Sequence, residues 1–158
     1  MERRNVLKAA LFSGAAVLFG KGIAVAREYF PVAVKEELFQ NINRVKDPAH
    51  MTGLEKKHSP VITAPESVKA GEPFDVDVTI GEIVHPMGPT HWIESLQMNI
   101  GNEPGGRVTF NSHGYLKPKA RFAVLLGENL KGKKVSLVMQ IKCNLHGIWE
   151  NYVNVEVL

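Results

Sequence analysis

The segment CNLHGIWE, residues 143–150, carries the residue types with the clearest chemistry in the chain. Cys143 is the only cysteine, and His146 follows three positions later. A thiolate and an imidazole at this spacing can bind one metal ion from a single tight turn. The pair alone leaves a second interpretation open, because a buried free cysteine beside a hydrogen-bonded histidine packs as a small hydrophobic residue.

Three more histidines lie in short segments next to proline or glycine, where loops hold ligands. His85 and His91 bracket the sequence HPMGPTH, and His58 lies in EKKHSP. With residues 143–146 they supply four imidazoles and one thiolate, donors that suit iron, copper or zinc rather than calcium or magnesium. A structural zinc site closes with four ligands, so five candidates exceed what such a site uses.

Three motifs, in this order, resemble the iron domain of the superoxide reductases, the neelaredoxin and desulfoferrodoxin family. They are KHSP at residues 57–60, HPM-x-x-x-H at 85–91, and CNLHG at 143–147 with the Trp-Glu pair that follows. The resemblance covers residues 51–158. It implies a mononuclear non-haem iron whose sixth position, opposite the sulfur, is open. The implied ligands are His58, His85, His91 and His146 in the equatorial plane and Cys143 on the axis.

The resemblance also implies the activity, which is one-electron reduction of superoxide to hydrogen peroxide at ferrous iron. An external electron-donor protein then returns the iron to the ferrous state, and a homo-oligomer is expected. An axial thiolate pushes electron density toward the open position, as it does in haem enzymes. Lys57 matches the family's catalytic lysine, whose ammonium group attracts a small anion and assists proton delivery. A plain surface lysine is the alternative at this position.

The sequence departs from the common family pattern at two points. Many members have Glu-Lys-His, whose glutamate can ligate ferric iron, whereas this chain has Glu55-Lys56-Lys57-His58. Alignment on His58 puts Lys56 where that glutamate would be. We therefore expect Glu55 not to be a ligand, and water, hydroxide or a buffer anion to take the sixth position of the oxidised site. The four-cysteine, rubredoxin-like centre of desulfoferrodoxins is also missing, so the chain resembles the one-iron form.

Two other functions compete with this interpretation. An exported blue-copper electron carrier is also a β-sandwich, with two histidines, one cysteine and usually an axial methionine as ligands. No methionine follows His146, and the chain has more imidazoles than that site needs. A non-catalytic binding module of periplasmic sulfur chemistry would keep the sandwich but would have no use for five ligands. A protein that folds and remains metal-free would favour the binding module.

Residues 1–26 are typical of a twin-arginine export signal. The sequence RRNVLK at 3–8 is followed by an apolar run at 9–20 and the small-residue site Ala24-Val25-Ala26. The apolar run is too short to span a bilayer. An uncleaved membrane anchor or a buried helix is the alternative. The signal predicts a periplasmic or otherwise exported protein, cleaved after Ala26, with no stable membrane anchor afterwards.

The charge balance depends on this segment. The chain has 19 Lys and Arg against 16 Asp and Glu, but residues 1–26 hold four of the basic residues and one of the acidic ones. The remaining chain is therefore near neutral, and nothing in it argues for nucleic-acid binding. A single cysteine in an exported protein cannot form an internal disulfide, which favours Cys143 as a ligand.

The remaining pattern predicts a short helical arm followed by strands. Apolar residues at 34, 38, 42 and 45 predict a helix over residues 34–46, in an arm spanning 27–50. Beyond Pro60 the hydrophobic period changes to two, and Gly- and Pro-rich turns separate the runs. This pattern predicts an all-β, antiparallel sandwich of about seven strands over residues 51–158, and the resemblance implies an immunoglobulin-like one. The expected strands are 61–62, 74–80, 92–100, 108–110, 120–126, 135–141 and 152–157.

Three polar features receive a surface interpretation. The run Lys131 to Lys134 is either a docking patch for an acidic electron donor or, as we expect, a solvated hairpin tip. His50 and His113 match no ligand position, and we expect surface or structural roles for both.

Overall fold

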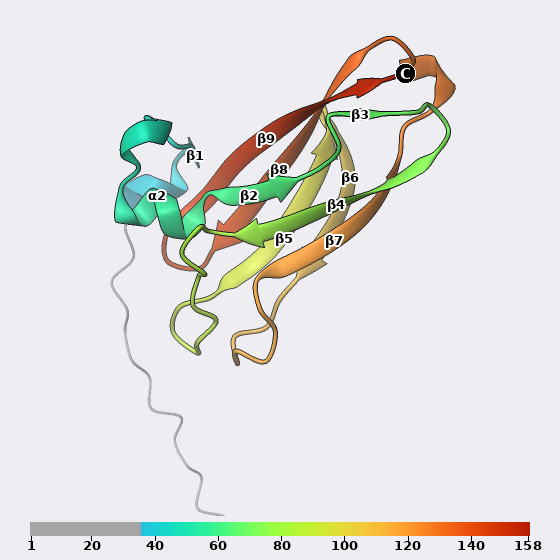
Figure 1. Cartoon of the computed structure of the whole chain (residues 1–158). Coiled ribbons are helices and arrows are strands. Elements are labelled where there is room, and N and C mark those ends of the chain that lie inside the picture. The colour runs from blue at the N-terminus through green and yellow to red at the C-terminus, as the bar shows by residue number, and fades with distance from the viewer. Residues whose placement is uncertain (1–35) are drawn as a thin grey trace, which may run out of the picture. The chain divides into compact units, whose positions relative to one another are not determined.

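The computed structural model describes residues 36–158 (Figure 1). The expected leader over residues 1–26, and the beginning of the expected arm, lie outside the described residues. Within residues 36–158, no helix is long and apolar enough to cross a membrane.

The described chain forms two β-sheets that face each other across a hydrophobic core (Figure 1). The larger sheet has the order β1-β9-β8-β5-β6, and β3 pairs with the far end of β9. The smaller sheet has the order β2-β4-β7 and is antiparallel. The larger sheet contains β1 (Ile42–Asn43), β3 (Ser67–Val68), β5 (Ile93–Ile100), β6 (Glu103–Thr109), β8 (Lys134–Cys143) and β9 (Gly147–Val157), and the smaller contains β2 (Pro60–Thr63), β4 (Pro73–Ile80) and β7 (Lys119–Leu125).

The alternation of hydrophobic residues with a period of two predicts which side chains form the core. Alternate residues of β4 and β8 point inward and are almost fully buried: Val76, Val78 and Ile80, and Leu137, Met139 and Ile141. All seven expected strands are present, and the immunoglobulin-like antiparallel sandwich is confirmed. The structure adds two strands of two residues each, β1 and β3, which pair in parallel with β9. It also starts β6 at Glu103, within residues 101–106, whose glycines and proline predict a turn.

The prediction of a helix over residues 34–46 is wrong for the part that the structure describes, which begins at residue 36. A 3₁₀ turn over Glu36–Phe39 and strand β1 take its place, and a second 3₁₀ turn follows at Pro48–His50. The side chain of Asn43 donates to the backbone oxygens of Leu38 and Ile148, both at 2.8 Å. Asparagine is a weak helix former that competes for backbone partners, and the edge of β9 offers such partners. Pairing with the sheet therefore replaces the helix.

A helix that the periodicity did not predict, α2 (Gly53–His58), begins with a capping box. The Thr52 hydroxyl accepts a hydrogen bond from the backbone N–H of Glu55, and the Glu55 carboxylate accepts one from the Thr52 N–H. Helix α2 lies beside the lower ends of β8 and β9 in Figure 1. A third 3₁₀ turn, η3 (Glu128–Leu130), precedes β8.

Candidate metal centre

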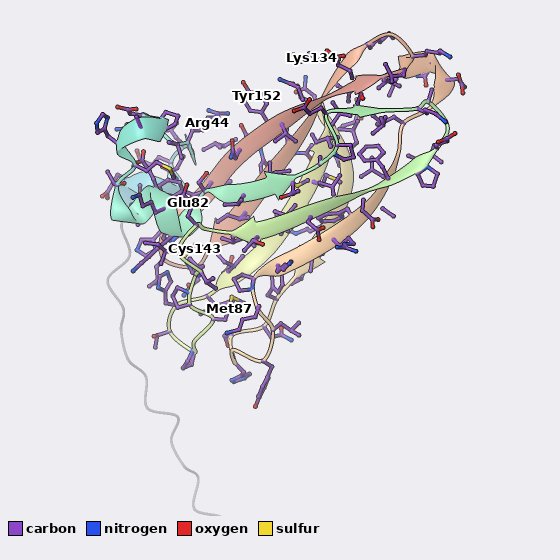
Figure 2. The ribbon with its side chains drawn as sticks, viewed as in Figure 1. Arg44, Glu82, Met87, Lys134, Cys143 and Tyr152 are labelled. Atoms are coloured by element: carbon purple, nitrogen blue, oxygen red, sulfur yellow. The ribbon has the colours of Figure 1, made fainter. Side chains whose placement is uncertain are left out.

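Three segments of the chain bring five side chains together at one end of the sandwich: the end of α2, the loop between β4 and β5, and the end of β8 with the turn that follows it. His58 ends α2, His85 and His91 lie in the loop of residues 81–92 between β4 and β5, Cys143 ends β8, and His146 lies in the turn from β8 to β9. We call these residues the five candidate ligands. One donor atom from each of His58, His85, His91 and Cys143 lies within 4.8 Å of all the others. Figure 2 shows Cys143 at the same end of the molecule as Met87, which lies between the two loop histidines.

The four imidazole rings form a square. Neighbouring ring centroids are 4.4–4.8 Å apart around the circuit His58, His85, His91, His146, and neighbouring rings are inclined at 71–77°. Across the diagonal, the centroids of His58 and His91 are 5.9 Å apart and their planes differ by 29°. The Cys143 sulfur lies 3.5 Å from Nδ1 of His146. Four nitrogens around one centre, with a sulfur beside them, suit a five-coordinate metal ion.

The hydrogen bonds of two rings fix which nitrogen faces the centre. Nδ1 of His58 donates to the oxygen of Leu54 at 2.7 Å, and Nδ1 of His85 donates to the oxygen of Pro86 at 2.6 Å. Because a carbonyl oxygen only accepts, each Nδ1 carries the proton, and each neutral ring keeps a lone pair on Nε2. These two Nε2 atoms are 3.1 Å apart. Two lone pairs at that distance repel, and a cation between them would remove the repulsion.

The rings of His91 and His146 also bring one nitrogen each close together. Nε2 of His91 lies 3.1 Å from Nδ1 of His146. The square therefore presents Nε2 from His58, His85 and His91, and Nδ1 from His146, toward its centre. A ligating histidine usually donates its other ring N–H to a carbonyl or carboxylate oxygen, which fixes the orientation of the ring, and His58 and His85 make such hydrogen bonds here.

Burial keeps the histidines neutral. His58 and His85 are 1% and 2% exposed, and burial lowers the pKa of His58 from 6.5 to about 4 and that of His85 to about 3. Burial also lowers the pKa of His91. Neutral imidazole is the form that binds a metal ion, so these three rings can bind one at pH 7 without losing a proton.

Cys143, unlike the neutral histidines, must lose its proton to bind a metal ion. Its side chain is fully buried, and burial raises the pKa of the thiol, while the backbone N–H groups of Leu145 and His146 lower it in part. A bound metal cation takes the place of the thiol proton. The donor set of four imidazoles and one buried thiol fits a mononuclear iron.

Lys57 and Glu55, which precede His58 on α2, have different environments. Lys57 is exposed, and its positive charge contributes to the lowered pKa values of His58 and His91. Glu55 is 7% exposed. Its carboxylate accepts hydrogen bonds from the N–H and hydroxyl of Thr52, at 2.7 and 2.8 Å, and from the N–H of Lys46 at 3.0 Å. These contacts occupy both oxygens and support the prediction that Glu55 is not a ligand.

Two residues that the sequence did not single out connect the segments that carry the ligands. Asn144 accepts from the N–H of Trp92 at 2.8 Å and donates to the oxygen of Thr90 at 2.9 Å, so it joins the β8–β9 turn to the loop that carries His91. Gly81 has a φ of +80°, and an added Cβ would lie 2.6 Å from the backbone oxygen of Lys57. The loop can therefore begin against the end of α2 only with glycine here.

The remaining polar features are not members of the square, although His113 lines the same pocket as His85. His50 is exposed and pairs with Asp47 at 2.8 Å, and the exposed ring of His113 lies 6.1 Å from that of Tyr115. Lys134 begins β8 and Cys143 ends it, so the Lys131–Lys134 run lies about 30 Å from the cluster at the usual strand rise. Figure 2 shows this separation. A solvated tip is therefore the better interpretation of that run.

Comparison with known proteins decides the family. The family model for desulfoferrodoxin matches residues 50–152, which include Lys57 and all five candidate ligands. The chain belongs to the desulfoferrodoxin family. It is 36% identical over 109 residues to a putative superoxide reductase of Methanocaldococcus jannaschii, covering 69% of this chain and 88% of the relative. It is 37% identical over 108 residues to the superoxide reductase of Pyrococcus abyssi, covering 64% of this chain and 89% of the relative.

Solved structures of this family have the same fold. The superoxide reductase (neelaredoxin) of Ignicoccus hospitalis aligns with a TM-score of 0.63 at 33% identity, covering 78% of this chain and 98% of that one. The putative superoxide reductase of Thermotoga maritima aligns with a TM-score of 0.61 at 26% identity, covering 75% of this chain and 96% of that one. Membership of the desulfoferrodoxin family, with four imidazoles converging on one point, argues against the blue-copper alternative, whose site uses two.

Proposed function

We propose that this protein is a superoxide reductase with a mononuclear iron held by His58, His85, His91, His146 and Cys143. The observation that carries the proposal is the square of four imidazoles beside a buried cysteine sulfur. Iron bound there supplies one electron to superoxide, which with two protons leaves as hydrogen peroxide, and no dioxygen is formed.

The protein's own residues hold the iron and limit access to it. His58, His85 and Cys143 are buried, whereas His91 and His146 are half-buried. The side of the square that carries His91 and His146 is therefore the one closer to solvent, and the small substrate enters there. The buried side excludes water from three of the five ligands, which strengthens electrostatic interactions within the site.

Lys57 serves the substrate on this open side. Its ammonium group is exposed and acts electrostatically on His91, the half-buried member of the square. A positive charge at the entrance raises the local concentration of a small anion and its rate of arrival. The same group stabilises the negative charge that the product carries before protonation, and its N–H bonds can pass a proton to it. The Glu55 carboxylate caps α2, so it would not ligate a bound iron, and water, hydroxide or a buffer anion would do so in the oxidised protein.

The reaction oxidises the iron by one electron in each turnover, so an external electron-donor protein completes the cycle. We propose further that the chain is exported by the twin-arginine pathway to the periplasm or beyond, on the basis of the RRNVLK sequence at residues 3–8. We also propose that it forms a homo-oligomer. The mass of the exported protein tests cleavage after Ala26, and its mass in solution under native conditions tests oligomer formation.

The products of the reaction test the proposed activity. A known amount of superoxide is added anaerobically to an excess of reduced, iron-loaded protein, and peroxide and dioxygen are counted. Reduction gives one peroxide for each superoxide and no dioxygen. One peroxide and one dioxygen from every two superoxides would mean dismutation and would refute the assignment.

A further inference from the structure

Trp149, in β9, contacts two candidate ligands that belong to different segments of the chain. Its side chain is buried, at 3% exposed. Its ring stacks on the ring of His58, with centroids 5.3 Å apart and planes inclined at 27°. Its indole Nε1–H donates to the backbone oxygen of His146 at 2.8 Å. His58 and His146 are neighbours in the square, with centroids 4.7 Å apart, so Trp149 supports one side of it.

Stacking on Trp149 restrains the tilt of the His58 ring, which the hydrogen bond from His58 to Leu54 leaves free. The bond from Nδ1 to the oxygen of Leu54 fixes one atom of the ring, but the ring can still tilt about the line of that bond. The lone pair on Nε2 lies in the ring plane, so a tilt would turn it away from the centre of the square. The indole face of Trp149 packs against the ring and fixes that plane.

The indole N–H restrains the turn that carries two other ligands. The ladder between β8 and β9 closes with the pair of Cys143 and Gly147, so residues 144–146 lie outside it. Asn144 holds one side of this turn through Trp92 and Thr90. The bond from Trp149 to the oxygen of His146 holds the other side. Loss of that bond would free the segment that sets the positions of the Cys143 sulfur and the His146 ring.

We propose that Trp149 is a positioning residue of the metal centre, which fixes the plane of the His58 ring and the turn between Cys143 and His146. The inference rests on the proposed function for the identity of the ligands. Contacts of this kind, made to ligands rather than to the metal, typically contribute 10- to 100-fold to metal affinity. Packing in the core alone would contribute to folding stability and leave the metal affinity unchanged.

Two substitutions separate the contacts, and a third is the control. Trp149→Phe keeps an aromatic face and removes the N–H donor, whereas Trp149→Leu removes both. Phe122→Leu removes a partly buried aromatic ring from the middle of β7, an edge strand of the other sheet. The full-length protein is measured for iron(II) affinity by competition with a chelator, and for the position of the thiolate-to-iron(III) absorption band. The free energy of unfolding of the metal-free protein is measured beside them.

We expect iron affinity to fall by about tenfold in Trp149→Phe and by about 10- to 100-fold in Trp149→Leu, with the band displaced in both. Phe122→Leu should lose folding stability and keep the parent's affinity and band. Parental affinity and band in both Trp149 variants would overturn the inference, and the phenylalanine variant decides alone if the leucine variant does not fold. A parent protein that binds no iron would instead refute the proposed function.

Discussion

Acidification of the metal-free protein should destabilise it steeply between pH 7 and pH 5, because two histidines are buried in the neutral form. The pKa of His58 is lowered from 6.5 to about 4, and that of His85 to about 3. In this window both rings gain a proton when the chain unfolds and stay unprotonated while it is folded. Since the unfolded state binds more protons, the free energy of unfolding falls as the pH falls.

The size of the effect follows from these pKa values. For each ring the proton linkage between pH 7 and pH 5 amounts to about 2 kcal/mol, so the pair contributes about 4 kcal/mol, or about a thousandfold in the unfolding equilibrium. Three carboxylates have pKa values lowered below their ordinary range: Asp47, Glu55 and Asp77. Their contribution is present above their unfolded pKa of about 4 and is lost only below it, so it does not affect this window.

Urea unfolding of the metal-free protein at a series of pH values measures this loss. His85→Gln should make the loss between pH 7 and pH 5 about 2 kcal/mol smaller than in the parent, because one buried protonation site is gone. His113→Gln changes an exposed ring outside the cluster and should keep the full loss. A total loss below about 1 kcal/mol in the parent would refute the conclusion that the square holds neutral, desolvated rings.

Three substitutions test other parts of the site. Cys143→Ser should abolish the thiolate-to-iron absorption band. A band that persists in this variant would show that the Cys143 sulfur is not a ligand. Lys57→Ala should keep the iron and slow the reaction with superoxide by about tenfold. Lys133→Ala, at the opposite end of the sandwich, should leave the rate unchanged. Equal rates in the two variants would show that Lys57 has no role in the reaction. Gly81→Ala should weaken iron binding, measured by chelator competition, because its Cβ would press on the end of α2. Gly132→Ala shares the positive φ but has open space around it, so it should cost only about 1–2 kcal/mol of stability; equal iron affinity in the two variants would contradict this account.

The strands and the clustering of candidate ligands could be predicted because both depend on local signals. Alternating residues such as Val76, Val78 and Ile80 mark one face of a strand wherever the strand lies. The ligands were identified by residue type, by neighbouring proline or glycine, and by the order of three motifs. Family membership and the clustering of His58, His85, His91 and Cys143 agree with that prediction.

The parts that could not be predicted depend on distant partners. Residues 42 and 43 leave the expected helix because the edge of β9 supplies hydrogen bonds, and the sequence does not show which edge is free. Helix α2 is too short for a periodic pattern, although Thr52 and Glu55 have the spacing of a capping box. The nitrogen that each ring turns inward depends on carbonyl groups such as that of Leu54. Trp149 resembles any core aromatic until its contacts with His58 and His146 are known.

The central claim is that this square of histidines, with its cysteine, holds an iron that reduces superoxide by one electron. The most direct test is anaerobic stopped-flow mixing of the reduced, iron-loaded protein with one equivalent of superoxide, followed by the visible spectrum. We predict a thiolate-to-iron(III) band that grows to one equivalent of iron, with one equivalent of peroxide. A spectrum that stays unchanged while superoxide persists would contradict the claim.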